Sequence, residues 1–202
     1  MSLSELSHQL ELPRRLVHAS GVCLPAGYLA GFLTWAEVGI LLLVGTVVVL
    51  ALEFARLRLG FTHYVYEKLT RPYEQHVVAG YALYVVGMLV AWVVFDPTPA
   101  LLGMLMLAIG DPVSGMIGNS VGDDGWSWYP PVGMGLVCLL IAVPVVVPAY
   151  GAVNGAVVAV AAAVCAVVAD EVKPTLGERV VDDNLTIPLY AAAGATVITY
   201  IL

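Results

Sequence analysis

The chain has 202 residues, of which 60% are hydrophobic and only 11% are charged. Soluble domains are about 45–50% apolar and about 25% charged, so this composition excludes a water-soluble protein with a separate catalytic domain. The 15 acidic and 8 basic side chains give a net charge of −7, which excludes a protein that binds nucleic acid through a basic surface. We therefore expect a multi-pass membrane protein that forms a single domain over residues 1–202.

The hydropathy pattern predicts an all-α membrane bundle of about seven transmembrane helices, because each span needs about 20 apolar residues. Thr34-Trp35-Ala36 separates the first two spans, and Asp96-Pro97-Thr98-Pro99 is a strong break between the third and the fourth. The expected spans are 16–34, 37–58, 77–95, 99–119, 131–150, 151–172 and 184–202.

The distribution of charge predicts the orientation of these spans. With seven spans, all eight lysines and arginines fall on the side of the N-terminus. The positive-inside rule then predicts a cytoplasmic N-terminus, an external C-terminus and an active site on the cytoplasmic side of the cell membrane. Leu3, Leu6 and Leu10 recur at helical spacing, so residues 1–13 form either an interfacial arm or a frayed terminus.

Two groups of polar residues are expected near the cytoplasmic ends of the first two spans. Arg14, Arg15 and His18 suit a phosphate chain, because arginine donates two hydrogen bonds to phosphate oxygens; membrane anchoring is the alternative. Glu53 and Arg56 share one helix face, either as a neutralised pair or as groups that orient a substrate phosphate.

A third group lies inside the fourth span. Gly110, Ser114 and Gly118 are four residues apart and permit close approach of another helix. Packing does not explain Asp111, a carboxylate about halfway along an apolar span that is followed by the helix-disrupting Pro112. A carboxylate at this depth requires a cation or a proton, so we expect Asp111 to be functional.

The fourth group joins the last two spans. Asp182, Asp183 and Asn184 are typical capping residues for the seventh span. With Asp111 and Glu171, these two aspartates would also share one membrane face with several arginines. Carboxylate oxygens without a cluster of cysteine and histidine favour Mg²⁺ that bridges phosphates over zinc.

The order of these groups resembles the polyprenol kinase family, which includes dolichol kinase, phytol and farnesol kinases and the CTP-dependent diacylglycerol kinase of fungi. The shared pattern is Arg-Arg-x-x-His, Glu-x-x-Arg, Gly-Asp-Pro-x-x-x-x-x-Gly and Glu…Asp-Asp-Asn-Leu-Thr-Ile-Pro-Leu, and it extends from Arg14 to Leu189. The last of these segments is the most specific.

The resemblance implies transfer of a phosphoryl group from CTP to the hydroxyl of a membrane polyprenol of the dolichol type, with Mg²⁺ or another divalent metal. On this basis we expect three catalytic residues, with Glu171 or Asp183 as the general base, and four metal ligands. The catalytic residues are Asp111, Glu171 and Asp183, and the metal ligands are Asp111, Glu171, Asp182 and Asp183. The expected nucleotide and phosphate contacts are Arg14, Arg15, His18, Glu53, Arg56, Gly110, Ser114, Gly118, Lys173 and Asn184.

One segment departs from the family pattern. Members carry a lysine and a Glu-Gly pair after the Gly-Asp signature, whereas residues 123–133 contain neither lysine nor glutamate. Trp126, Trp128 and Tyr129 either stack on the nucleotide base or form an interfacial aromatic belt. We therefore expect weaker discrimination among nucleotides than the family pattern implies.

Three other functions fit the same residues. The substrate is a different lipid alcohol (phytol, geranylgeraniol or a diacylglycerol-like lipid), or the enzyme transfers a cytidylyl group to a lipid phosphate, or the protein is a cation- or proton-coupled transporter. The outer halves of the expected spans are nearly free of charge, which favours a one-sided active site over a transport path. The acidic balance is typical of a halophilic archaeal protein, whose partners would be a lipid alcohol in the bilayer and a cytoplasmic nucleotide.

Overall fold

A computed structural model describes residues 12–61, 63–121, 127–177 and 179–202, and in this part of the chain the fold is almost entirely helical. Five of the described helices are long and apolar enough to cross a membrane: Trp35–Leu59, Pro97–Gly118, Tyr129–Tyr150, Ala152–Glu171 and Asp183–Ile201. A shorter apolar helix spans Gly80–Val94. The expected all-helical membrane bundle is confirmed at this level, whereas the count of seven spans and their orientation stay predictions.

Apart from the first expected span, the apolar helices begin and end close to the expected ones. In chain order they are α2 (Leu12–Ser20), α3 (Cys23–Leu29), α4 (Trp35–Leu59), α5 (Tyr64–Leu69), a 3-10 turn (Pro72–His76), α6 (Gly80–Val94), α7 (Pro97–Leu105), a π-helical turn (Met106–Gly110), α8 (Asp111–Val121), α9 (Tyr129–Tyr150), α10 (Ala152–Glu171) and α11 (Asp183–Ile201). A short antiparallel hairpin, β1 (Thr175–Leu176) and β2 (Arg179–Val180), joins α10 to α11.

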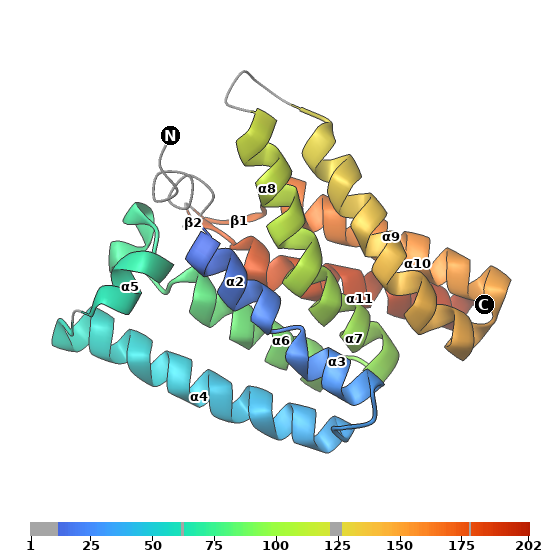
Figure 1. Ribbon diagram of the computed structural model, residues 1–202, viewed down its shortest axis with the longest axis horizontal. Helices are drawn as coiled ribbons and strands as arrows, with labels where there is room; N and C mark the ends of the chain where they lie inside the picture. Colours follow the sequence, from blue (N-terminus) through green and yellow to red (C-terminus); the bar gives the residue numbers. More distant parts are fainter. Residues whose placement is uncertain (1–11, 62, 122–126, 178) are drawn as a thin grey trace.

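Helix α11 lies inside the bundle, where it packs against α6, α7 and α10, and α9 and α4 lie farther out (Figure 1). Small residues bring the backbones of these helices into contact. A Cβ atom added at Gly87 of α6 would lie 2.4 Å from the Asn184 carbonyl oxygen, and one at Gly103 of α7 would lie 2.2 Å from the Pro188 carbonyl oxygen. The start of α11 is therefore fixed closely against two neighbouring helices.

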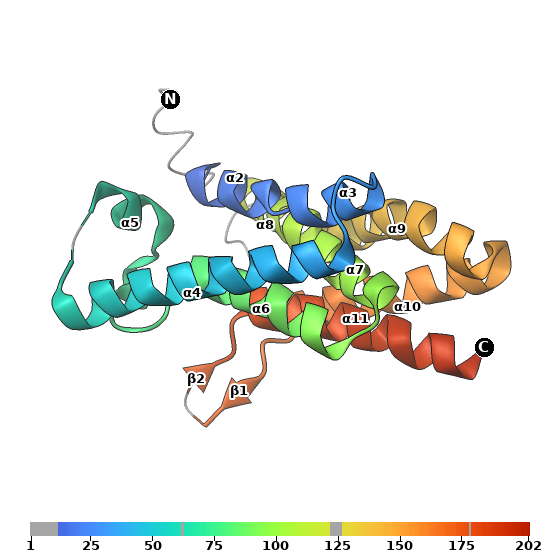
Figure 2. The ribbon, with the colours of Figure 1, turned by 90° about the horizontal axis from the view of Figure 1, so that it is seen from below.

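The polar segments gather at one end of the bundle. Helix α2 begins, α4 ends and the β1–β2 hairpin projects at this end, whereas α11 ends at the opposite one (Figure 2). Large apolar side chains of α4, such as Ile40, Leu43 and Val47, are more than half exposed on the outer surface of the bundle. An exposed apolar face of this kind is what contact with lipid requires.

The first expected span, 16–34, is not one continuous helix, because the chain leaves α-helical geometry between α2 and α3. Gly21 N–H donates to the His18 carbonyl at 3.0 Å, and Pro25 has no N–H to donate to the carbonyl of Gly21. The Tyr84 hydroxyl donates to the same His18 carbonyl at 2.7 Å, so this backbone group stays paired inside the bundle.

The close contact at the break predicts the effect of a single methyl group. In Gly21→Ala the added Cβ would lie 1.9 Å from the Tyr84 hydroxyl oxygen, so the free energy of unfolding should fall by about 1–3 kcal/mol. The thermal unfolding midpoint in detergent measures this loss. Gly45→Ala is the matched control, because its nearest neighbour would be a Val85 methyl at 3.4 Å, an ordinary contact. Equal midpoints for the two variants would contradict the role of this contact.

Candidate active site

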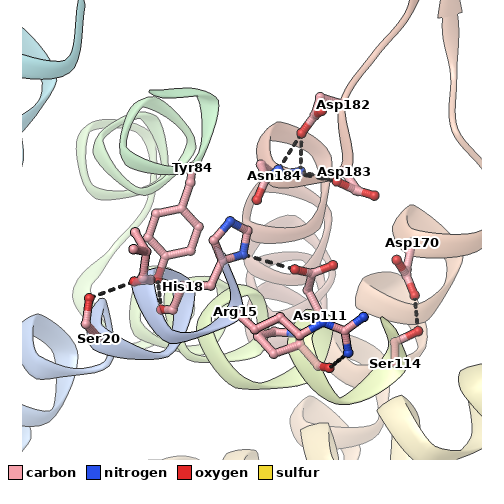
Figure 3. Close-up of polar contacts among 12 residues, drawn as sticks. Arg15, His18, Ser20, Tyr84, Asp111, Ser114, Asp170, Asp182, Asp183 and Asn184 are labelled. Atoms are coloured by element: carbon pink, nitrogen blue, oxygen red, sulfur yellow. Dashed lines mark hydrogen bonds and ion pairs between the residues drawn. The ribbon is translucent and has the colours of Figure 1, made fainter. Parts of the chain in front are cut away.

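Three carboxylates from three helices meet at the polar end of the bundle. Asp111, Asp170 and Asp183 each offer an oxygen, and these three oxygens lie within 4.8 Å of one another. Figure 3 shows Asp111 on α8, Asp170 near the end of α10 and Asp183 at the start of α11. We call these three residues the carboxylate cluster.

The π-helical turn sets the direction of Asp111. Asp111 N–H donates to the Met106 carbonyl, five residues earlier, in place of the usual four. The cause lies in the next residue, since Pro112 has no N–H and its ring crowds the carbonyl of Ala108. The proline therefore widens one helical turn without ending the helix, which continues to Val121 as α8.

Two hydrogen bonds hold the other carboxylates of the cluster. The Ser114 hydroxyl donates to Asp170 Oδ2 at 2.6 Å, and Lys173 Nζ donates to Asp183 Oδ2 at 2.6 Å. Partial burial acts to lower the pKa of Lys173, but the Asp183 carboxylate outweighs it, so this pKa lies above its ordinary value. Lys173 is therefore a stable positive charge beside the cluster.

Asp182 caps the first turn of α11, as its sequence position indicated. Its Oδ1 accepts from the Asn184 backbone N–H at 3.0 Å and from the Asn184 side-chain amide at 2.6 Å. Burial and the neighbouring Asp183 charge raise the pKa of Asp182. The cap fixes Asp183 in the first turn of the helix, where its side chain is largely buried and reaches the cluster.

A cationic pocket adjoins the cluster. Its lining includes Arg14, Arg15, His18 and Arg71, and it continues over Asp111, Pro112 and Gly115 with a volume of about 40 Å³. Arg15 NH1 donates to the Pro112 carbonyl at 3.2 Å. We call this cavity the phosphate pocket, after the ligand that we propose for it below.

His18 joins the phosphate pocket to the carboxylate cluster. Its ring stacks on Tyr84 at 4.5 Å between centroids, and its Nδ1 lies 3.1 Å from Asp111 Oδ2. The buried His18 Nε2 and Asn184 Oδ1 have no hydrogen-bond partner among the described residues. Because buried polar atoms are ordinarily paired, both atoms are available to a ligand that enters the site.

The carboxylate cluster offers oxygen ligands alone, the type that Mg²⁺ prefers to the nitrogen and sulfur ligands typical of zinc sites. All three carboxylates stay ionised at this distance only where a cation offsets their charge; without one, a carboxylate takes up a proton. Asp111, Asp170 and Asp183 are therefore the described residues that could hold a divalent metal ion.

Several expected site residues come together, and others do not. Asp111, Asp183, Arg14, Arg15 and His18 lie in the cluster or the pocket. Ser114 and Lys173 each contact a carboxylate of the cluster, and Asn184 lies beside Asp183. Glu171 is exposed, and the three-carboxylate group found among the described residues contains neither it nor Asp182.

Gly110 and Gly118 face a neighbouring helix. A Cβ atom at Gly110 would lie 3.0 Å from Cys138 Sγ, and one at Gly118 would lie 3.8 Å from Pro130 Cγ, both on α9. Glu53 and Arg56, also expected to contact phosphate, bind each other through two hydrogen bonds of 2.8 and 2.7 Å. Contacts of these four residues with phosphate stay predictions.

The sequence interpretation missed two residues of the site, Asp170 and Arg71. Asp170 had a detectable signal, because the buried alanines of α10 recur every three or four residues and place Asp170 on the same face. Those alanines are Ala159, Ala162, Ala163, Ala166 and Ala169. Arg71 had none, because it follows α5 in a connecting segment with no periodic pattern.

The aromatic loop expected to contact the nucleotide base is described only in part. Trp126 lies outside the described residues, whereas the rings of Trp128 and Tyr129 are 4.1 Å apart and both side chains are about half exposed.

Comparison of the chain with protein-family models, curated proteins and solved structures found no match.

A pair of adjacent acidic residues tests the metal site. Asp170→Asn should weaken Mn²⁺ binding at least about tenfold, because it removes a charged oxygen from the cluster. Glu171→Gln removes the same charge one residue later, at an exposed position, and should leave the affinity unchanged. Titration of the purified protein with Mn²⁺, followed by electron paramagnetic resonance, measures both. The reverse order of effects would favour Glu171 as the ligand.

Proposed function

We propose that this protein is a metal-dependent lipid kinase that transfers the γ-phosphoryl group of CTP to the hydroxyl of a membrane polyprenol of the dolichol type. The observation that carries the proposal is the phosphate pocket directly beside the carboxylate cluster, with Asp111 lining the first and belonging to the second. Phosphoryl transfer requires this combination of metal-binding oxygens and fixed cations.

The residues divide the proposed reaction between them. Asp111, Asp170 and Asp183 would hold Mg²⁺, which would neutralise negative charge on the phosphate groups. Arg14, Arg15 and Arg71 bind the phosphates and stabilise charge on the transferred group. Of the two residues expected as general base, Asp183 lies in the cluster and Glu171 does not. We therefore propose that the hydroxyl proton of the lipid moves to the carboxylate oxygen of Asp183 that does not hold the metal.

The position of the site suits a substrate that stays in the bilayer. Asp170 is the last residue but one of α10, and Asp183 is the first residue of α11. The reacting hydroxyl of a lipid alcohol lies at the membrane surface, at the depth of these helix ends, while its chain lies against apolar helix faces. The motif order that resembles polyprenol kinases supports the same substrate class.

A transporter is the less favoured alternative. A transport path needs polar groups at successive depths, whereas the first half of α4, after Glu37, and the residues of α10 before Asp170 are almost entirely apolar. A cytidylyltransferase uses the same metal chemistry at a different phosphorus atom, so position-specific labelling of CTP distinguishes it from a kinase.

The kinase assay uses purified protein, polyprenol in detergent and CTP labelled at either the α- or the γ-phosphorus. We expect label from γ-labelled CTP in the extracted lipid, and none from α-labelled CTP. EDTA should abolish the transfer and added Mg²⁺ should restore it. Asp111→Asn should reduce transfer to background while Glu171→Gln stays active. Label only from α-labelled CTP, or no label in lipid, would reject the kinase.

The nucleotide preference is a separate prediction. The phosphate pocket contacts a part that all nucleoside triphosphates share, and stacking on Trp128 or Tyr129 tolerates any base. We expect CTP to be preferred over ATP, GTP and UTP by less than about a hundredfold in kcat/KM. Competition among the four nucleotides in the lipid assay measures the ratio, and a larger preference would show that specific base contacts exist.

A further inference from the structure

The Arg56 guanidinium on α4 binds the backbone of the segment 71–80, which leads from α5 to α6. Arg56 donates from Nε and NH2 to both carboxylate oxygens of Glu53, as a two-point ion pair. Its NH1 and NH2 groups also donate to backbone carbonyls of the segment 71–80. These acceptors are the carbonyls of Glu74 at 3.1 Å, Gln75 at 3.3 Å and Val77 at 2.7 Å.

Two buried carboxylates hold the backbone N–H groups of the same segment. Glu53, 2% exposed, accepts from Ala79 N–H at 2.9 Å. Glu74, 1% exposed, accepts from Arg71 N–H at 2.6 Å and from Gly80 N–H at 2.9 Å. The carboxylates thereby replace an N-cap for α6, whose Ala79 has no side chain that could cap it.

Both ends of this segment meet arginines of the phosphate pocket. Arg71, at its start, lines the pocket. At its end, a Cβ atom added to Gly80 would lie 2.7 Å from Arg14 NH2, so the backbone there runs directly against a second pocket arginine. The shape of the segment therefore sets where two of the pocket's cations lie.

Direct contact of Arg56 with phosphate would be costly. Arg56 would have to release Glu53 and three backbone carbonyls, which would leave a buried carboxylate without its counter-charge. Loss of one partner from such a buried pair is strongly destabilising. The Arg56 guanidinium therefore stabilises the protein more by staying bound to Glu53 and the three carbonyls than it would by binding phosphate.

We propose that Glu53, Arg56 and Glu74 are positioning residues, which fix the segment 71–80 so that Arg71 presents its guanidinium to a phosphate group in the pocket. They act through Arg71 and do not contact phosphate themselves. The inference rests on the proposed function in one respect, that the pocket binds phosphate, and it assigns Glu53 and Arg56 a role other than the phosphate contact expected from the sequence.

A double-mutant cycle tests whether Arg56 acts through Arg71. Binding of inorganic pyrophosphate in Mg²⁺ buffer is measured by calorimetry on Arg56→Ala, Arg71→Ala and the double variant. Each single change should raise Kd at least about tenfold, and the double variant should be no weaker than Arg71→Ala by more than about twofold. Arg58→Ala is the matched control, because Arg58 is an exposed arginine of the same helix turn, and it should bind as the wild type does.

Amide hydrogen exchange separates positioning from contact. Exchange over residues 72–82 should accelerate at least about tenfold in Arg56→Ala, while Arg71→Ala should leave it unchanged. Glu74→Gln is a second, milder variant that loses one of two N–H bonds and should show both effects. Glu37→Gln, which alters a capping carboxylate at the far end of α4, should show neither.

Additive effects of Arg56→Ala and Arg71→Ala, or unchanged exchange in Arg56→Ala and Glu74→Gln, would overturn the inference. Wild-type protein that does not bind pyrophosphate would overturn it as well. The proposed kinase fails on a different result: protein that binds pyrophosphate and shows the cycle above, yet transfers no label from CTP to lipid, would retain the positioning role and lose the lipid kinase.

Discussion

The mutual repulsion of three carboxylates governs the polar end of this molecule. Oxygens of Asp111, Asp170 and Asp183 lie within 4.8 Å of one another, and all three carboxylates stay ionised only when positive charge offsets theirs. Lys173 supplies part of it from the connection between α10 and α11, and the pocket arginines supply part from outside the cluster. Three helices hold the carboxylates and the pocket arginines close together. They are α11 with its capped start, α8 and α2.

Four arginines at the polar end of the bundle have two kinds of role. Arg14, Arg15 and Arg71 line the phosphate pocket, whereas Arg56 donates to a carboxylate and to backbone carbonyls. A guanidinium can do either, because its planar fork fits a carboxylate, a phosphate or a set of carbonyls. Arg56 is held by the buried Glu53, whose two carboxylate oxygens both accept from its guanidinium.

The sequence predicted those features that depend on local pattern. Long apolar runs located the helices of 37–58, 131–150, 151–172 and 184–202 within a few residues, and Asp182 was recognisable as a cap. Features that depend on distant contacts were not predictable. The hydrogen bond that pairs the His18 carbonyl at the break after α2 comes from Tyr84, far along the chain, and the role of Arg56 depends on carbonyls of the segment 71–80. Asp170 and Glu171 are both acidic, and only the helical periodicity of the preceding alanines separates them.

The π-helical turn at Met106–Gly110 lets one apolar span have two different surfaces. A π-turn accommodates one additional residue within an α-helix, and each residue turns the helix by about 100°. The side chains of α8 are therefore one residue out of register with those of α7. On the α7 side of the turn the helix packs with buried apolar residues against α11, and on the α8 side Asp111 and Ser114 reach carboxylates of two neighbouring helices.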